Sequence, residues 1–151
     1  MPSRPKYRIT QKYSGMTAII INNGKVLLLK RRNIPVIMNP GIWAFLSGGR
    51  DGRERYIHTA YREIEEESGL KKDSLKLLYR KRRLVTDEGR RLCWYNWIFI
   101  FRSNTSKVKL DYENSAYRWA TLRQIEKEIN YTNVFINRRE IERKIGEYIH
   151  G

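Results

Sequence analysis

The chain has 151 residues, of which 31 are lysine or arginine and 16 are aspartate or glutamate, so its formal net charge is +15. This length predicts one domain over residues 1–151, and no apolar run reaches the roughly 20 residues of a membrane-spanning helix. The basic N-terminal segment shows no apolar stretch typical of a secretory signal, and Cys93 is the single cysteine. We therefore expect a protein of the reducing cytoplasm without membrane partners, in which Cys93 is a buried, inert thiol.

The first part of the chain predicts a hairpin of two strands. Residues 1–15 contain two prolines and many charges, so we expect an irregular start. Residues 16–21 form a run that is apolar apart from Thr17, which is typical of a buried strand, and Asn23-Gly24 is a strong hairpin signal. Residues 25–29 then form the returning strand.

Further elements follow in an alternating order. Prolines and a glycine predict a loop at 33–41, followed by a strand at 42–46 that leads into a glycine-rich loop. Thr121 and Gln124 have the spacing of a capping box, which predicts that a helix begins there. The remaining predictions are helices at 55–68 and 133–149 and strands at 75–86, 90–101 and 116–120. This order predicts an α/β/α sandwich with a mixed sheet.

The most informative segment is 48–70, where three glutamates follow a run of glycines. Glu63, Glu66 and Glu67 lie three and four positions apart, so they share one flank of a helix, beside an apolar stripe that faces the core. Crowded carboxylates repel one another unless a cation neutralises them, and Mg²⁺ commonly links protein carboxylates to substrate phosphates. The alternative is an acidic amphipathic helix whose charged face is simply solvated.

The order of residues in this segment resembles the box of the Nudix hydrolase family, of the MutT-like type, G-x5-E-x7-R-E-U-x-E-E-x-G-U with U a bulky aliphatic residue. All of its fixed positions are matched. They are Gly48, Glu54, Arg62, Glu63, Ile64, Glu66, Glu67, Gly69 and Leu70. One departure precedes the box, where Ser47 replaces the proline of many relatives; that position supplies backbone only.

The resemblance implies an enzyme that hydrolyses a pyrophosphate linkage in a nucleoside diphosphate derivative, with Mg²⁺ or Mn²⁺ as cofactor. It implies that Glu67 is the leading metal ligand, with Glu66 and Glu63 beside it and the Ser47 carbonyl nearby. Glu63 is also the candidate base that activates water. Arg62 and Glu54 are expected to support the catalytic helix and to hold the loop against it.

Residues outside the box extend the predicted site. Glu113 is a candidate further metal ligand, with Asp111 as a rival and a solvated loop acid as the alternative. Arg31 and Arg32 resemble residues that bind substrate phosphates in some relatives, or they end a strand in solvent. Gly48 and Gly49 are expected to bring backbone close to the substrate.

Aromatic residues on the strands could stack on a nucleobase, although most are expected in the core. The candidates are Trp43, Trp94, Tyr95, Trp97 and Trp119. Alternation along a strand places Tyr95 and Trp97 on one face and Trp94 on the other.

The high positive charge leaves the partner open. It is consistent with a small nucleotide polyphosphate, with RNA, or with general solubility. The alternatives to a small-nucleotide hydrolase are an RNA-binding or regulatory module and a pyrophosphohydrolase of RNA 5′ ends. A homodimer is the further expectation from the family.

Overall fold

The structure is a computed structural model that describes residues 6–34, 41–128 and 138–150. Part of the predicted loop at 33–41 and residues 133–137 of the predicted last helix lie outside the described residues. In chain order the elements are β1 (Arg8–Ile9), β2 (Gly15–Asn22), β3 (Lys25–Arg31), β4 (Trp43–Ala44), β5 (Leu46–Gly49), α1 (Tyr56–Ser68), a 3-10 turn (Lys72–Ser74), β6 (Leu75–Asp87), β7 (Leu92–Ser103), β8 (Asn114–Ala120), α2 (Leu122–Glu128) and α3 (Arg138–Tyr148).

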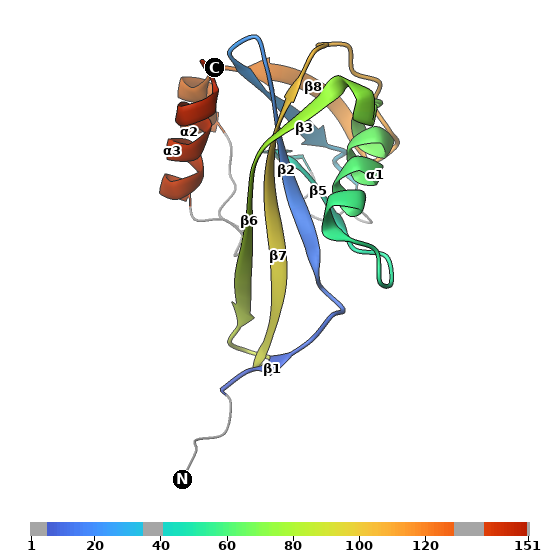
Figure 1. Cartoon of the computed structure of the whole chain (residues 1–151), viewed down its shortest axis with the longest axis vertical. Helices are drawn as coiled ribbons and strands as arrows, with labels where there is room; N and C mark the ends of the chain where they lie inside the picture. The colour runs from blue at the N-terminus through green and yellow to red at the C-terminus, as the bar shows by residue number, and fades with distance from the viewer. Residues whose placement is uncertain (1–5, 35–40, 129–137, 151) are drawn as a thin grey trace.

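The strands form one mixed sheet between two helical layers, with α1 on one side and α2 and α3 on the other (Figure 1). The central path runs β1-β7-β2-β3-β4, while β5 pairs with β2, β6 with β7 and β8 with β3. The pairs β2–β7 and β1–β7 are parallel, and the other pairs are antiparallel. The predicted α/β/α sandwich is confirmed.

Strand β2 is buried on both of its faces, which accounts for the run of apolar residues in its sequence. Ile19 and Ile21 face the α2–α3 layer and pack with Ile141 and Ile145, whereas Ile20 faces α1. Since both faces of the sheet are covered at this level, every successive side chain of β2 from Met16 to Ile21 is buried.

The segment around the predicted strand at 42–46 differs from the prediction. It forms two short strands, because the chain changes partner at Phe45: β4 pairs with β3, and β5 pairs with β2. Gly48 and Gly49, which we expected in a loop, therefore belong to β5 and lie opposite Met16 and Gly15. The irregular start also contains an unpredicted strand, β1, which is only two residues long and depends on pairing with β7.

The capping box is confirmed. The Thr121 backbone N–H donates to Gln124 Oε1 at 2.8 Å, and the Gln124 N–H donates to Thr121 Oγ1 at 3.3 Å. These two hydrogen bonds satisfy donors that the first turn of α2 would otherwise leave free.

Two glycines provide a matched test of the packing. A Cβ on Gly15 would lie 2.4 Å from the Gly48 carbonyl oxygen, whereas a Cβ on Gly146 in α3 would meet Leu122 at an ordinary 3.7 Å. We expect Gly15→Ala to lower the free energy of unfolding by about 1–3 kcal/mol, because β2 and β5 must separate. Gly146→Ala should raise it by about 0.5–1 kcal/mol, because alanine favours a helix interior. Urea unfolding measures both; a stable Gly15→Ala variant would contradict the close strand contact.

Candidate active site

Helix α1 carries the box glutamates and is held against the sheet by its apolar stripe. Ala60 and Ile64 are fully buried in the core on this side of the sheet. Gly69 ends the helix in the left-handed region at φ +74°, and its N–H donates to the Glu65 carbonyl at 2.8 Å. The helix therefore has a fixed rotation, with its glutamates beside β5.

Strand β5 touches α1 at Gly48. A Cβ there would lie 2.2 Å from Cδ of Glu63, so only glycine leaves room for that carboxylate. At Gly49 an added Cβ would meet nothing within 4 Å. The first box glycine is thus required by contact, while the second is sterically free.

Arg62 joins the strand, the following loop and the helix. Its Nε and Nη2 donate to the two carboxylate oxygens of Glu54 at 3.0 and 2.9 Å, a bidentate pair. Its Nη1 donates to Glu63 Oε1 at 2.8 Å, and Nη2 also donates to the Gly49 carbonyl at 3.1 Å. One guanidinium therefore orients Glu63 and ties β5 to α1.

Glu54 is saturated with donors. Besides Arg62, it accepts hydrogen bonds from Thr59 Oγ1 at 2.7 Å and from the Asp51 N–H at 3.2 Å. These bonds, that from Arg62 foremost, lower the pKa of Glu54 to about 2. Thr59 was not identified from the sequence; the signal was a polar residue beside Ala60 on the apolar stripe.

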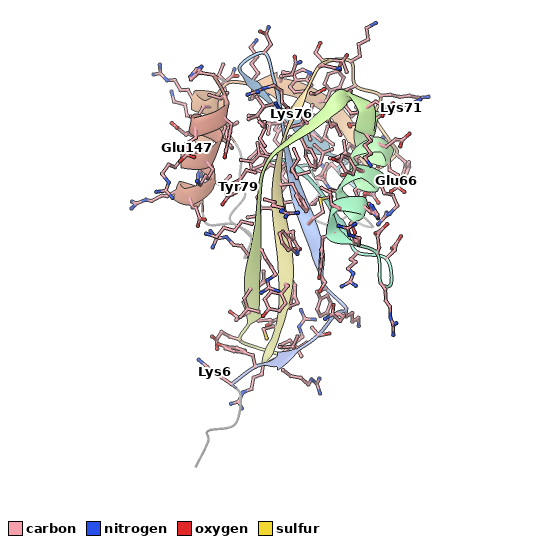
Figure 2. The ribbon with its side chains drawn as sticks, in the orientation of Figure 1. Lys6, Glu66, Lys71, Lys76, Tyr79 and Glu147 are labelled. Atoms are coloured by element: carbon pink, nitrogen blue, oxygen red, sulfur yellow. The ribbon has the colours of Figure 1, made fainter. Side chains whose placement is uncertain are left out.

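The three clustered glutamates lie in different environments. Their side chains are 16% (Glu63), 57% (Glu66) and 5% (Glu67) exposed. Glu66 reaches Arg62 only at 3.5 Å, and Figure 2 places it on α1, on the side of the sheet opposite to Glu147 of α3. Glu67 is thus buried more deeply than a position beside the apolar stripe predicts, because the rotation of α1 turns it towards Arg31.

Glu67 is a buried carboxylate with incomplete compensation. Its Oε2 has no hydrogen-bond partner, and its Oε1 lies 3.8 Å from Nη1 of Arg31. Burial first, then the charges of Glu63 and Asp111, raise the pKa of Glu67 to about 9, while Arg31 opposes this shift. Burial likewise raises the pKa of Glu63, although Arg62 partly offsets it.

The segment before β8 brings both candidate loop acids towards this carboxylate. Nη1 of Arg31 lies 3.4 Å from Glu113 Oε2, so Arg31 stands between Glu113 and Glu67. Asp111 accepts a hydrogen bond from Asn114 Nδ2 at 2.9 Å, and both acids contribute to the raised pKa of Glu67.

Two other predicted residues lie less directly at the site. Arg32 donates from Nε to the Tyr112 carbonyl at 2.7 Å and lies over the Tyr112 ring, so it anchors the loop before β8. Ser47 is in β5 opposite Thr17, immediately before Gly48.

The aromatic candidates are distributed over the sheet. Tyr95 and Trp97 share the α1 side of β7, as alternation predicts, while Trp94 is buried on the other face against Tyr13. Trp119 donates from Nε1 to the Ser106 carbonyl at 3.0 Å. Trp43 lies in β4 beneath Arg118. Cys93 is buried, as expected.

The donor set fits a hard divalent cation only in part. Within residues 6–34, 41–128 and 138–150, no three Asp, Glu, His or Cys side chains converge as a ready cage. Arg62 draws Glu63 aside, and Glu66 is exposed. However, Mg²⁺ needs only one or two protein carboxylates when phosphates supply the other oxygens. The unpartnered Oε2 of Glu67 offers such a ligand beside Glu63.

Comparisons with known proteins bear on the family and the fold. The family model of the NUDIX domain matches residues 12–142 of this chain. A search of curated proteins finds no match. Similar solved structures include an Ap4A hydrolase from C. elegans, with TM-score 0.72 and 19% identity over 92% of this chain and 98% of that chain. Another is the Nudix hydrolase RenU from M. smegmatis, with TM-score 0.69 and 19% identity over 93% of this chain and 86% of that chain. A third is a MutT protein from Methanosarcina mazei Go1, with TM-score 0.64 and 21% identity over 93% of this chain and 95% of that chain.

The chain belongs to the Nudix family, and with it to the hydrolases that act on acid anhydrides. The solved structures share its fold across nearly the whole chain, which confirms the MutT-like architecture. In the part of the chain that the structure describes, no helix is both long and apolar enough to cross a bilayer.

The contact between Gly48 and Glu63 can be tested with two alanines. We expect Gly48→Ala to displace the Glu63 carboxylate, because the colliding atoms belong to a flexible side chain, and to leave the fold intact. Affinity for Mn²⁺, measured by calorimetry, should fall by about tenfold or more. Gly49→Ala, which points into open space, should bind Mn²⁺ like the parent. Equal affinities for all three proteins would contradict the assigned contact.

The burial of Glu67 predicts a pH-dependent stability. The pKa of Glu67 is raised from 4.5 to about 9 in the folded protein. The stability that its protonated carboxyl retains is therefore fully present below pH 4.5 and is lost as the pH rises towards 9. In metal-free protein, Glu67→Gln should therefore match the parent Tm at pH 4.5 and exceed it increasingly up to pH 9. Each kcal/mol by which Glu67→Gln is more stable than the parent should raise its Tm above that of the parent by about 2–4 °C.

The matched control is Glu66→Gln, which changes an exposed side chain of the same helix. Its Tm should follow that of the parent at every pH in a thermal-shift or calorimetric series. Parallel curves for Glu67→Gln and the parent would mean that Glu67 is not held as a buried carboxyl.

Proposed function

We propose that the protein is a divalent-metal-dependent pyrophosphohydrolase that cleaves a pyrophosphate linkage in a small nucleotide derivative. The observation that carries this proposal is the Glu67 carboxylate, which is buried, lacks a partner at Oε2 and lies beside Glu63. A carboxylate held in this way is unfavourable unless it is protonated or ligates a cation. A structural acid on a solvated helix face would not need such burial.

Glu67 and Glu63 would hold Mg²⁺ or Mn²⁺, with the Ser47 carbonyl as a nearby oxygen donor and Glu66 and Glu113 as outer ligands. When bound, the ion would neutralise phosphate oxygens and make phosphorus more open to attack by water. This assignment requires Glu67 and Glu63 to be ionised, and the charge of the ion favours that form.

The other side chains have distinct proposed roles. Glu63 would accept the proton of the attacking water, because Arg62 orients its carboxylate and its side chain is mostly buried beside Glu67. Arg62 would act as a positioning residue, since it holds Glu63 at 2.8 Å and the Gly49 carbonyl at 3.1 Å. Arg31 would exchange its contacts with Glu67 and Glu113 for a substrate phosphate once a metal neutralises those acids.

The substrate class rests on the box and on the names of similar structures. An Ap4A hydrolase and a dihydroneopterin triphosphate pyrophosphohydrolase, the latter from E. coli with TM-score 0.65 and 16% identity, share the fold. Both names describe phosphoanhydride substrates, so a nucleotide carrying two or more linked phosphates is the chemistry to test. The net charge of +15 would favour encounter with such anions.

A hydrolysis screen tests the proposal. Nucleoside triphosphates, damaged nucleotides, sugar nucleotides, dinucleoside polyphosphates and 5′-triphosphorylated or capped RNA would be incubated with Mg²⁺ or Mn²⁺. On the best substrate, Glu67→Gln should lower kcat by at least about 100-fold, because it removes a charged ligand and leaves the shape nearly unchanged.

Glu65→Gln is the matched control, since Glu65 is an exposed neighbour on the same helix outside the matched box positions. It should retain the parent rate, and circular dichroism should show that both variants are folded. No turnover of any compound by the parent with either metal would overturn the proposed activity. Equal rates for Glu67→Gln and the parent would overturn the role of Glu67.

A further inference from the structure

The outer half of the β6–β7 hairpin extends beyond the helical layers. In Figure 1 the two strands continue downwards past α1 on one side and past α2 and α3 on the other. Leu84, near the end of β6, is 55% exposed although it is a large apolar residue. No described helix covers this part of the sheet, and on it Arg82 and Leu84 are exposed while Tyr95 is half-buried.

The strand register gathers cations and rings on the α1 side of this extension. Cross-strand partners share a face of a sheet, and alternate residues along a strand do so too. The partner pairs on this side are Arg80 with Phe99, Arg82 with Trp97 and Leu84 with Tyr95. Phe99 belongs to the core beneath α1, which identifies the side.

A small cavity lies where this face meets the start of α1. Its volume is about 230 Å³, and it is lined by Arg55, Tyr56, Ile57, Arg80, Trp97 and Phe99. The Trp97 and Phe99 rings are stacked at 10° with centroids 5.9 Å apart, and Tyr56 lies 6.0 Å from Trp97. The cavity is smaller than the roughly 300–1,000 Å³ that encloses a drug-sized ligand, so it suits one planar ring system.

The cations of this face are not neutralised by acids. Among the described residues, Arg55, Arg80 and Arg82 form no ion pair, and the Arg82 guanidinium lies 4.2 Å from the Tyr95 ring centroid. On the opposite face of the same strand, Lys81 and Arg83 are both paired with Glu140 of α3. The cations on the two faces of β6 therefore differ in one respect: only those on the α3 side have an acid beside them.

We propose that the hairpin face, defined as Arg55, Tyr56, Arg80, Arg82, Tyr95 and Trp97, binds single-stranded nucleic acid. Phosphates would pair with the three arginines, and bases would stack on the Trp97 and Tyr95 rings or on the Arg82 guanidinium. Arg80 and Arg82 are about 7 Å apart along the strand, so they can contact successive parts of an extended backbone. A duplex, whose bases are stacked inside, could use only the charge.

This surface is separate from the proposed hydrolytic centre. Tyr56 begins α1 and Glu67 lies near its end, eleven residues on, which is roughly 16 Å along the helix axis. Binding to the hairpin face therefore does not require turnover. Glu67→Gln, which should remove hydrolysis, should bind nucleic acid like the parent.

Fluorescence anisotropy with labelled oligonucleotides of about 12 residues tests the proposal. The probes are single-stranded RNA, single-stranded DNA and the matching RNA duplex, each over a series of salt concentrations. We expect the parent to bind the single strands more tightly than the duplex. Preference for RNA or for DNA would both support the proposal, whereas equal or tighter binding of the duplex would overturn it.

Charge removal on the two sides of the sheet separates a site from general attraction. The double variant Arg80→Gln/Arg82→Gln should weaken single-strand binding at least tenfold and reduce the salt slope by about 1.4, since each phosphate contact contributes about 0.7. Arg123→Gln/Lys127→Gln removes the same charge from exposed positions of α2, on the other side of the sheet. It should change affinity less than threefold; equal losses in both variants would overturn the proposal.

The stacking contribution has its own variant. Tyr95→Leu keeps apolar bulk and removes the ring, so affinity should fall by at least about fivefold with an unchanged salt slope. Tyr95→Phe should restore binding. Parent-like affinity of Tyr95→Leu, or no binding of any probe by the parent, would overturn the proposal, and the Tm of each variant verifies folding.

Discussion

The ion pair between Arg62 and Glu54 is the constraint on which the rest of the site depends. This bidentate pair fixes the loop after β5 to the middle of α1, and the same guanidinium reaches Glu63 and the Gly49 carbonyl. Because one planar group serves three partners, the distance between strand and helix has little freedom. Gly48 is then required to be small, since Glu63 occupies the space that a Cβ would fill.

Two carboxylates close to α1 show how environment divides their roles. Glu54 accepts hydrogen bonds from Arg62, Thr59 and the Asp51 backbone, which lower its pKa to about 2, so it is a permanent anion. Glu67 is buried near other acids with Arg31 as its nearest cation, and its pKa is raised to about 9. The first is satisfied by the protein alone, whereas the second would be satisfied by an added cation. This difference in compensation separates the supporting acid from the proposed metal ligand.

The long β6–β7 hairpin serves two surfaces of different character. Near the helices it forms the centre of both cores, and Phe99 and Ile100 are buried on opposite faces. Farther out, Glu140 pairs with Lys81 and Arg83 on one face only. On the other face Arg80 and Arg82 lie beside the half-buried rings of Tyr95 and Trp97 with no acid paired to them in the described residues.

The amino-acid sequence by itself determined the family, the helix that carries the box glutamates and the layered fold, because these depend on local spacing and on matched residues. The contact of Arg62 with Glu54 could also be predicted from the box. Even the capping box at Thr121 and Gln124 could be predicted, since its hydrogen bonds span three residues. Only the tertiary structure decided which glutamate is buried, because the rotation of α1 against the sheet sets the exposure of Glu66 and Glu67. It also decided the change of strand partner at Phe45. Likewise, it placed Arg31 between Glu67 and Glu113, although each of these three residues is more than 30 positions from the others along the chain. Such contacts follow from the packing of whole elements, and no local pattern of residues encodes them.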